Sequence, residues 1–304
     1  MIPDSNRIAR RWVCAVALAC VAGAAGVHAS TAEASTSAEV AAPQYDREKL
    51  LKSLDEIDSR RLSVETLVAR LDIVLRDKNK DKEHALNGAY LGDKDGNLRL
   101  RIKHQETLLL DMAFHEGSVD LLLPRKRRYF RGSVEDLKKA GGNELALLAH
   151  AGTAHDLFFP RPWTETAFER RVVIENGKPV VSVLEMPGVF KRRVRSYQLS
   201  SEHAVATRAD IFDLQSQFLG AIRFEDYRFK TPGAGEAAER PTDLTYPGRV
   251  TLATASDKQE LQLDVQELIP NVPIPLEKLR VPVPEGMQIR DLAEALQTGQ
   301  SLWE

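Results

Sequence analysis

The feature that most constrains this sequence is a run of alternating apolar and polar residues between Asn97 and Gly132. Residues 98–103 alternate aliphatic with basic side chains, the pattern of a strand with one apolar face and one solvent-exposed face. Similar runs follow at 107–114 and 118–123, and a fourth short run ends at Gly132. Four strands joined by such short connections predict an antiparallel meander with one long aliphatic face.

The aliphatic face of this meander supplies the first candidate residues for a binding site. If the face lines a cavity, the cavity suits an acyl chain, because each buried methylene contributes about 0.8 kcal/mol without any polar contact. The alternative is that the same face is an ordinary packed core. The candidate residues are Leu98, Leu100, Ile102, Leu108, Leu110, Met112, Phe114, Val119, Leu121 and Leu123.

A second group of candidates lies between two blocks of predicted strands. Residues 143–159 predict a helix, and Leu145 and Leu148 share one helix face because they are three positions apart. Such a helix can cross the concave face of the sheet as a lid. Phe158 and Phe159 belong to the densest aromatic segment, which is either a lid edge, a surface that meets a membrane or partner, or a helix end docked in the core.

The first 29 residues have the features of an export signal. Three arginines precede an apolar stretch at 12–26, which is too short and weak for a confident transmembrane helix, and small residues lead to a cleavage site after Ala29. The segment before Cys20 also approximates a bacterial lipoprotein signal. The two alternatives give a soluble periplasmic protein or one anchored to the outer membrane by lipid. Residues 30–44, rich in Ala, Ser and Thr, predict a flexible spacer.

Composition excludes several classes of protein. Both cysteines, Cys14 and Cys20, lie in the export signal, so we expect no internal disulfide after processing. A formal net charge of −2 and 6% aromatic residues do not suit a general nucleic-acid binder. Residues 45–304 form a segment long enough to bury its own core without a disulfide.

The rest of the pattern predicts a single domain at 45–304 of mainly β (α+β) class. About eleven strands are expected, including one over 218–230, with helices over 45–61, 133–139 and 289–296. Strands do not alternate with helices, so a doubly wound sheet is excluded. The expected fold is an unclosed antiparallel β-barrel whose helices cover the concave face.

Three segments of the chain resemble the bacterial lipoprotein-localisation proteins LolA and LolB and their lipoprotein-sorting relatives. They are the meander itself, residues 244–251 (LTYPGRVT), and residues 271–286 (NVPIPLEKLRVPVPEG), where Leu279 stands in place of the family's usual Phe. The resemblance implies an unclosed β-barrel with a helical lid over an apolar cavity. Members hold the acyl chains of lipoproteins, or in one relative sense envelope stress. No ligand-binding residue of the family can be carried over.

Signals for catalysis are weak. The chain has no G-x-S-x-G elbow, no H-E-x-x-H motif and no phosphate-binding glycine loop, and its histidines are scattered. We therefore expect no catalytic residue, no metal site and no cofactor. The basic turn at 125–128 is either a site for anionic lipid headgroups or a solvated turn.

The predicted function is that of a non-catalytic envelope carrier or receptor for lipid or lipoprotein acyl chains, with a role in outer-membrane lipoprotein sorting. A membrane or an envelope protein is a further expected partner, and nucleic acid is not. The alternative function is an envelope stress sensor or protein-binding scaffold built on the same half-barrel.

Overall fold

The computed structural model describes residues 46–78, 81–139, 149, 154–161, 168–176, 178–185, 192–200, 205–213, 215–230, 244–256 and 259–297. The predicted export signal and spacer, together with Leu145 and Leu148, lie outside the described residues. No helix in the described part is both long enough and apolar enough to cross a membrane.

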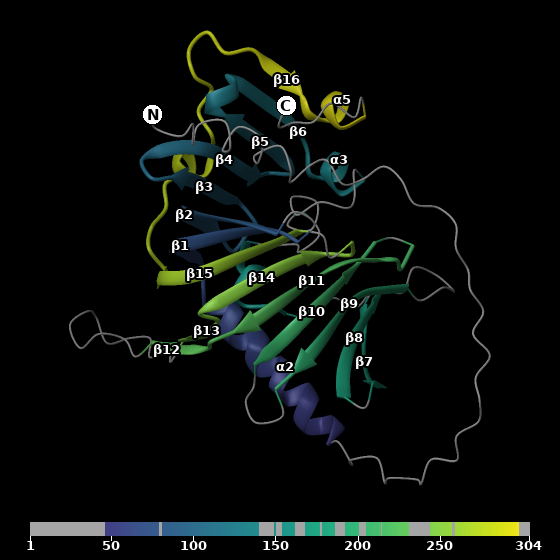
Figure 1. Ribbon diagram of the computed structural model, residues 1–304. Helices are drawn as coiled ribbons and strands as arrows, with labels where there is room; N and C mark the ends of the chain where they lie inside the picture. Colours follow the sequence, from purple (N-terminus) through teal and green to yellow (C-terminus); the bar gives the residue numbers. More distant parts are fainter. Residues whose placement is uncertain are drawn as a thin grey trace.

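One curved sheet dominates the fold (Figure 1). It has 14 strands in the order β16-β6-β5-β4-β3-β2-β1-β15-β14-β11-β10-β9-β8-β7, while β12 and β13 pair separately. Every pair in the large sheet is antiparallel except β16 with β6. The sheet order ends at β16 on one side and at β7 on the other, so the barrel is unclosed, as predicted.

The strands have the following bounds: β1 Thr66–Asp77, β2 Lys82–Asp93, β3 Leu98–His104, β4 Thr107–His115, β5 Ser118–Leu123, β6 Arg128–Ser133, β7 Phe168–Glu175, β8 Lys178–Glu185, β9 Arg192–Leu199, β10 Ala206–Phe212, β11 Phe218–Glu225, β12 Arg228–Lys230, β13 Leu244–Tyr246, β14 Arg249–Thr254, β15 Gln259–Pro270 and β16 Ile289–Asp291. The helices are α2 Arg47–Leu62, α3 Val134–Lys139 and α5 Leu292–Gln297, with short 3₁₀ turns η1 Pro124–Lys126, η2 Ala154–Leu157 and η3 Leu276–Leu279.

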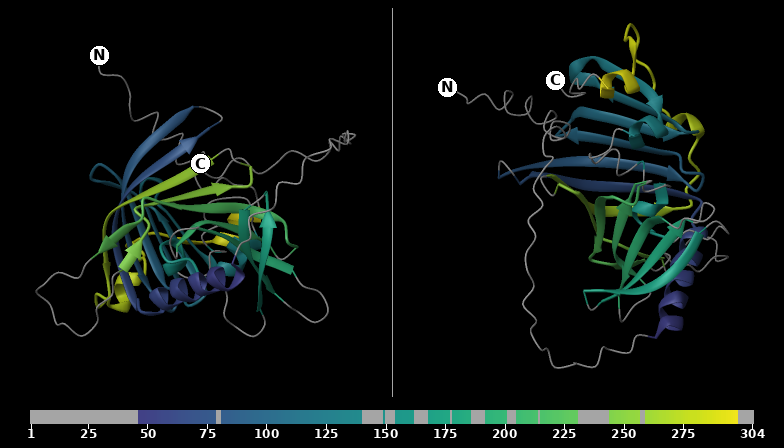
Figure 2. Two further views of the ribbon diagram at one scale, coloured as in Figure 1. Left: turned by 90° about the horizontal axis from the view of Figure 1, so that it is seen from below. Right: turned by 90° about the vertical axis from the view of Figure 1, so that its right-hand side faces the viewer.

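Helix α2 lies across the open side of the curved sheet (Figure 2). Asp46 caps it, because its carboxylate accepts hydrogen bonds from the backbone N–H groups of residues 48 and 49 at 3.0 and 3.1 Å. Leu50, Leu54 and Ile57 repeat at helical spacing and are all buried in the same apolar cluster as the concave face of the sheet. The helix therefore covers part of that face, on the side of β7 to β13 (Figure 1).

The end of α2 is fastened to the sheet through Asn271, at the end of β15. The Asn271 side chain accepts from the backbone N–H of Glu65 at 2.8 Å and donates to the carbonyl of Ser63 at 3.2 Å. Its backbone N–H donates to the carbonyl of Thr66 at 2.8 Å. Asn271 has a φ of 60°, a left-handed conformation that Asn tolerates better than most residues. The helix thus leaves the sheet from a fixed point.

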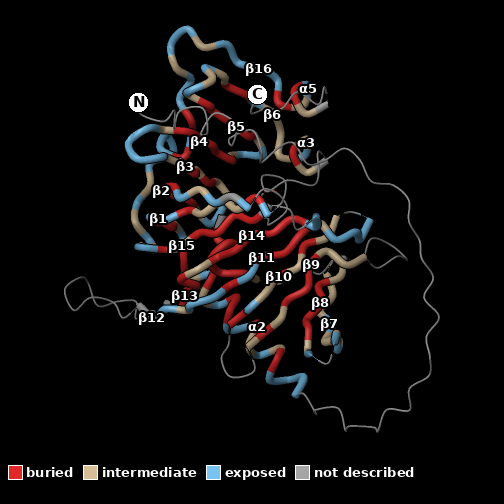
Figure 3. Tube along the Cα trace, viewed as in Figure 1, coloured by how far each residue is buried: buried red, intermediate tan, exposed pale blue. Residues whose placement is uncertain are grey.

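Buried residues occur along most strands of the large sheet (Figure 3). The large core cluster lies on the concave side, and a smaller one on the convex side of β4–β6 contains Ala113, Leu122, Tyr129 and Val281. Val281 belongs to residues 272–288, which run from β15 to β16 and cover this part of the convex face.

Several predictions about elements differ from the structure. The large sheet has 14 strands, against about eleven expected. The predicted strand 218–230 is divided at residue 226, which has a φ of 53°, into β11 of the large sheet and β12, which pairs with β13 in a separate small sheet. The predicted closing helix at 289–296 begins instead as β16, which pairs with β6 before α5 starts at Leu292. Within the predicted helix 143–159, residues 154–157 form the 3₁₀ turn η2.

Candidate functional site

The aliphatic face predicted from the meander is part of one continuous apolar layer on the concave side. Strand register places Tyr90 opposite Leu100, Leu100 opposite Met112, and Met112 opposite Leu121. All four side chains lie in the large core cluster. The other predicted residues that the structure brings into this layer are Leu98, Ile102, Leu110, Phe114, Val119 and Leu123.

Leu108 does not lie with the others. The register of β3 and β4 shifts between Ile102 and Lys103, where a bulge leaves Lys103 opposite Leu108. Leu109 is 8% exposed and belongs to the core cluster, whereas Leu108 does not. A bulge adds one residue to one strand, so the period-two prediction fails beyond it. Whether the residues of this layer bind a ligand remains a prediction.

Phe158 and Phe159 pack into the core directly after η2. They are 1% and 3% exposed, and the Phe158 ring meets the Tyr90 ring edge to face at a centroid distance of 5.1 Å. Of the three alternatives for this aromatic segment, these two residues fit the helix end that docks in the core. They do not form an exposed contact surface.

A small pocket lies where α2 meets η2. Ile57, Phe158, Phe159 and Val205 contribute apolar walls, and Arg60 lies at the rim. Its water-accessible volume is about 20 Å³, which is room for about one water molecule. In this form the pocket is too small for an acyl chain.

A polar cluster lies next to this pocket beneath α2. Asp156 of η2 is 3% exposed and forms ion pairs with three guanidinium groups. The distances are 3.0 Å to Arg195, 3.4 Å to Arg61 and 4.0 Å to Arg161. Arg195 also donates to the hydroxyl of Tyr197 at 3.3 Å. One buried carboxylate therefore joins the helix, the 3₁₀ turn and strand β9.

Two members of this cluster have no hydrogen-bond partner. Both carboxylate oxygens of Asp58 and both ring nitrogens of His155 are buried and unpaired, and the two side chains are 6% and 0% exposed. Burial raises the pKa of Asp58 to about 6, against the opposing effect of Arg161. Burial also lowers the pKa of His155 to about 4, and neighbouring Arg61 acts in the same direction. Both groups are therefore held in environments that disfavour their charged forms.

Sequence reasoning missed this polar cluster. One signal was available, because Asp58 and Arg61 interrupt the apolar stripe of α2 at helical spacing from Leu54. Alternation in β9 groups Arg195 with Arg193 and separates it only from Arg192, so this strand gave no such signal. No local pattern could show that these residues meet His155 and Asp156, which lie about a hundred positions from α2 and about forty from β9.

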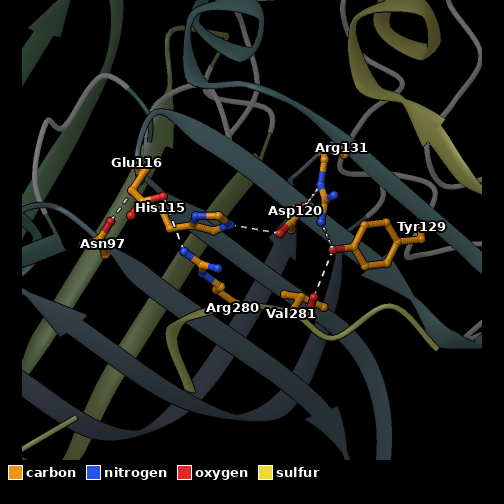
Figure 4. Close-up of polar contacts among 8 residues, drawn as sticks. All are labelled: Asn97, His115, Glu116, Asp120, Tyr129, Arg131, Arg280 and Val281. Atoms are coloured by element: carbon orange, nitrogen blue, oxygen red, sulfur yellow. Dashed lines mark hydrogen bonds and ion pairs between the residues drawn. The ribbon is translucent and has the colours of Figure 1, made fainter. Parts of the chain in front are cut away.

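A separate polar cluster lies on the convex face (Figure 4). Asp120 is 1% exposed and accepts from Arg131 at 2.7 Å, and His115 lies 3.1 Å away. Burial alone would raise the pKa of Asp120, but hydrogen bonds from Arg131 and His115 hold it below its usual value. The hydroxyl of Tyr129 donates to the carbonyl of Val281 at 3.0 Å. This cluster links residues 272–288 to the sheet through the Tyr129–Val281 hydrogen bond.

No group of three or more potential metal ligands occurs within the described ranges. His115, on β4, is part-buried beside Asp120, and His155, in η2, is buried beside Asp156.

Comparisons with known proteins give fold neighbours only. No family model and no curated protein matches the chain. Among solved structures, a domain described as an outer membrane lipoprotein-sorting protein from Vibrio parahaemolyticus has a TM-score of 0.49 and 11% identity, covering 77% of this chain and 97% of that one. A LolA superfamily protein from Nitrosomonas europaea has a TM-score of 0.47 and 12% identity, covering 78% and 99%.

The sequence resemblance to LolA-like proteins thus has counterparts among solved structures. The lipoprotein LppX of Mycobacterium tuberculosis is a more distant neighbour, with a TM-score of 0.28 and 8% identity over 76% of this chain and 99% of that one. Likenesses with TM-scores below 0.5 carry no argument about what this chain binds. The function has to be argued from the residues of this chain.

Proposed function

We propose that this protein is a non-catalytic carrier or receptor that binds the acyl chains of lipids or lipoproteins on the concave face of its sheet. The observation that carries the proposal is the continuous apolar layer that β2 to β6 form on the concave side of the sheet. Its members include Tyr90, Leu100, Met112, Leu121 and Phe130 in one cross-strand row. Such a surface binds a long chain through area alone.

Helix α2 is the element that has to move. It is fixed at its C-terminal end by Asn271, whereas its contacts with the sheet include buried charges that lose hydration in the closed state. Swinging the helix outward returns Asp58 and Arg61 to water and exposes the apolar layer. The electrostatic gain on opening partly offsets the loss of apolar contacts, so a ligand that replaces those contacts favours the open form.

The location in the cell envelope and the role in lipoprotein sorting are further parts of the proposal. They rest on the predicted export signal at 1–29 and on the sequence resemblance, and both alternatives for processing, after Ala29 or before Cys20, agree with them. A carrier in the periplasm and a receptor held at the outer membrane would use the same concave face.

Locking α2 to the sheet should prevent acyl-chain binding. Asp55 of α2 pairs with Arg170 of β7 at 2.9 Å, and both side chains are accessible, with relative exposures of 64% and 31%. In a chain with Cys14 and Cys20 changed to serine, Asp55→Cys and Arg170→Cys can be joined by a short bismaleimide. Native mass spectrometry after incubation with vesicles should show bound lipid before cross-linking and almost none afterwards.

The two single-cysteine variants, treated with the same reagent, are the matched controls and should retain lipid. Equal lipid retention in the cross-linked protein would show that the helix does not open. If no variant and no wild-type sample ever carries lipid, the proposed function itself is wrong.

A further inference from the structure

The polar cluster beneath α2 has a composition that an apolar lid contact does not need. Arg61, Arg161 and Arg195 all approach Asp156, at 3.4, 4.0 and 3.0 Å. Apolar side chains stabilise a contact between a helix and a sheet at a lower desolvation cost, because burying each charge loses several kcal/mol of hydration. Arg61 and Arg161 also interact electrostatically with Asp58.

Two fully buried side chains in the same place lack partners. Asp58 is 6% exposed with neither oxygen bonded, and His155 is 0% exposed with neither ring nitrogen bonded. Buried polar atoms are nearly always hydrogen-bonded in native proteins, and an unpaired one is strongly unfavourable. An anionic group placed here accepts a hydrogen bond from the ring N–H of His155, and from Asp58 only when that carboxyl is protonated.

The cluster also adjoins the apolar surface along the chain. Ile57 lines the small pocket and precedes Asp58, while Phe158 lines the same pocket two positions after Asp156. Apolar and charged surfaces therefore meet along one side of α2. A molecule that fits both has a long apolar part and a compact charged end.

We propose that the polar cluster binds the anionic head, a carboxylate or phosphate, of an amphiphile whose acyl chain lies on the concave face. The inference rests on the proposed function and deepens it by naming the class of head group. Arg61 is the primary binding residue, because it is carried by the helix that opens and can meet the ligand as α2 closes over it. His155 hydrogen-bonds the same head group from η2.

Asp58 sets the strength of this binding through its own charge. The charged and titratable groups around it are Arg61 on its own helix, His155 and Asp156 on η2, Arg161 after η2, Arg170 on β7 and Tyr197 on β9. An ionised Asp58 repels an anionic head, whereas a protonated Asp58 can donate a hydrogen bond to it. Because burial raises the pKa of Asp58 to about 6, the carboxyl is ionised at pH 8 and opposes the ligand there.

The test compares ligands with one chain length and different heads. Hexadecanoate, hexadecyl phosphate and hexadecanol are titrated at pH 8 into the full-length protein, by displacement of a fluorescent fatty-acid probe, with inorganic phosphate as the head-only arm. At least one of the two anions should bind about tenfold more tightly than the alcohol, the equivalent of one charge-assisted hydrogen bond. Hexadecanoate and hexadecyl phosphate then distinguish the two kinds of head group.

Two variants make the inference falsifiable even if one of them fails to fold. Arg61→Gln should reduce the anion's advantage to about that of the alcohol. Asp58→Asn, which removes an unfavourable buried charge, should strengthen anion binding about tenfold at pH 8 and leave hexadecanol unchanged. Arg70→Gln, at an exposed position of β1, is the control and should behave like the wild type.

Each remaining outcome contradicts the inference. Equal affinity for the alcohol and both anions would leave an apolar carrier without a head-group site, so the proposed function would survive alone. If Asp58→Asn left the ratio of anion affinity to alcohol affinity unchanged, Asp58 would not act on the head group. Inorganic phosphate binding as tightly as hexadecyl phosphate would indicate a free-ion site instead. Binding of no ligand at all would overturn the proposed function as well.

Discussion

Replacing Asp156 with alanine is expected to lower the free energy of unfolding by about 3–5 kcal/mol, because it leaves buried guanidinium groups without their shared carboxylate. Arg195 and Arg61 are each 4% exposed in their ion pairs with Asp156, so neither can recover its hydration without local opening. Urea unfolding followed by circular dichroism measures the change. The same loss should loosen α2, so dye binding to exposed apolar surface should rise in parallel.

Asp55→Ala is the matched control for this prediction. Asp55 is also on α2 and forms an ion pair with Arg170 of β7 at 2.9 Å, but the Asp55 side chain is 64% exposed. An exposed ion pair contributes about 0–1 kcal/mol, so this variant should unfold nearly like the wild type. Equal effects of the two alanine variants would contradict the view that the buried cluster holds the helix.

The second large effect is a pair of opposite pH dependences that nearly cancel in the wild type. Folding lowers the pKa of His155 from 6.5 to about 4 and raises the pKa of Asp58 from 3.8 to about 6. For His155, the unfolded state binds the proton first, so its burial destabilises the fold progressively as the pH falls from 6.5 to 4. For Asp58, the folded state binds the proton first, so its burial destabilises the fold progressively as the pH rises from 3.8 to 6.

The single variants should separate the two dependences. Asp58→Asn should match the wild type near pH 4 and become about 3 kcal/mol more stable than it by pH 7. His155→Phe should match the wild type above pH 6.5 and become more stable than it, by a similar amount, toward pH 4. Differences from the wild type at each pH remove the contribution of all other titrating groups, so the two difference curves should slope in opposite directions.

Urea unfolding of the three proteins at half-unit steps between pH 4 and 7 measures these curves. Asp72→Asn, which changes a carboxylate on β1 that accepts from Gln266 at 2.7 Å in an exposed position, is the control variant outside the cluster. Flat difference curves for both Asp58→Asn and His155→Phe would show that the two side chains are hydrated in solution and that the cluster beneath α2 is open.

Alternation in the sequence predicted correctly which side chains share a face of the sheet, even where both faces pack against other residues. Leu121 and Leu122 are neighbours in β5, yet Leu121 belongs to the concave cluster and Leu122 to the convex one. Period-two alternation separates such neighbours because a strand directs successive side chains to opposite faces. The same rule placed Met112 and Leu100 on the concave face, where the register of β3 and β4 brings them together.

The rule fails where a single residue changes the register or the direction of the chain. The β3–β4 bulge places Leu109 rather than Leu108 in the core, and residue 226 divides a predicted strand. The bulge and the break each depend on the backbone conformation of one residue, and the pattern of apolar and polar residues around them does not reveal either. They change the positions of individual side chains but not the fold class.

The polar cluster could not be assembled from the sequence for a different reason. Asp58, Asp156 and Arg195 come from three elements far apart in the chain, and each is an ordinary charged residue in its local context. Their proximity is a product of the curved sheet, which brings β9 and η2 under the helix that precedes β1. Long-range contacts of this kind depend on the order and curvature of the strands in the sheet, which the local sequence patterns did not determine.

The central claim is that an acyl chain lies on the concave face of the sheet. Methyl NMR with a doxyl-labelled stearate tests it most directly, because Leu121 and Leu122 provide adjacent reporters on opposite faces. The account predicts strong broadening of the methyl signals of Leu121 and Met112, with those of Leu122 and Val281 unaffected. Broadening of Leu122 and Val281 instead, or equal broadening of both faces, would contradict it.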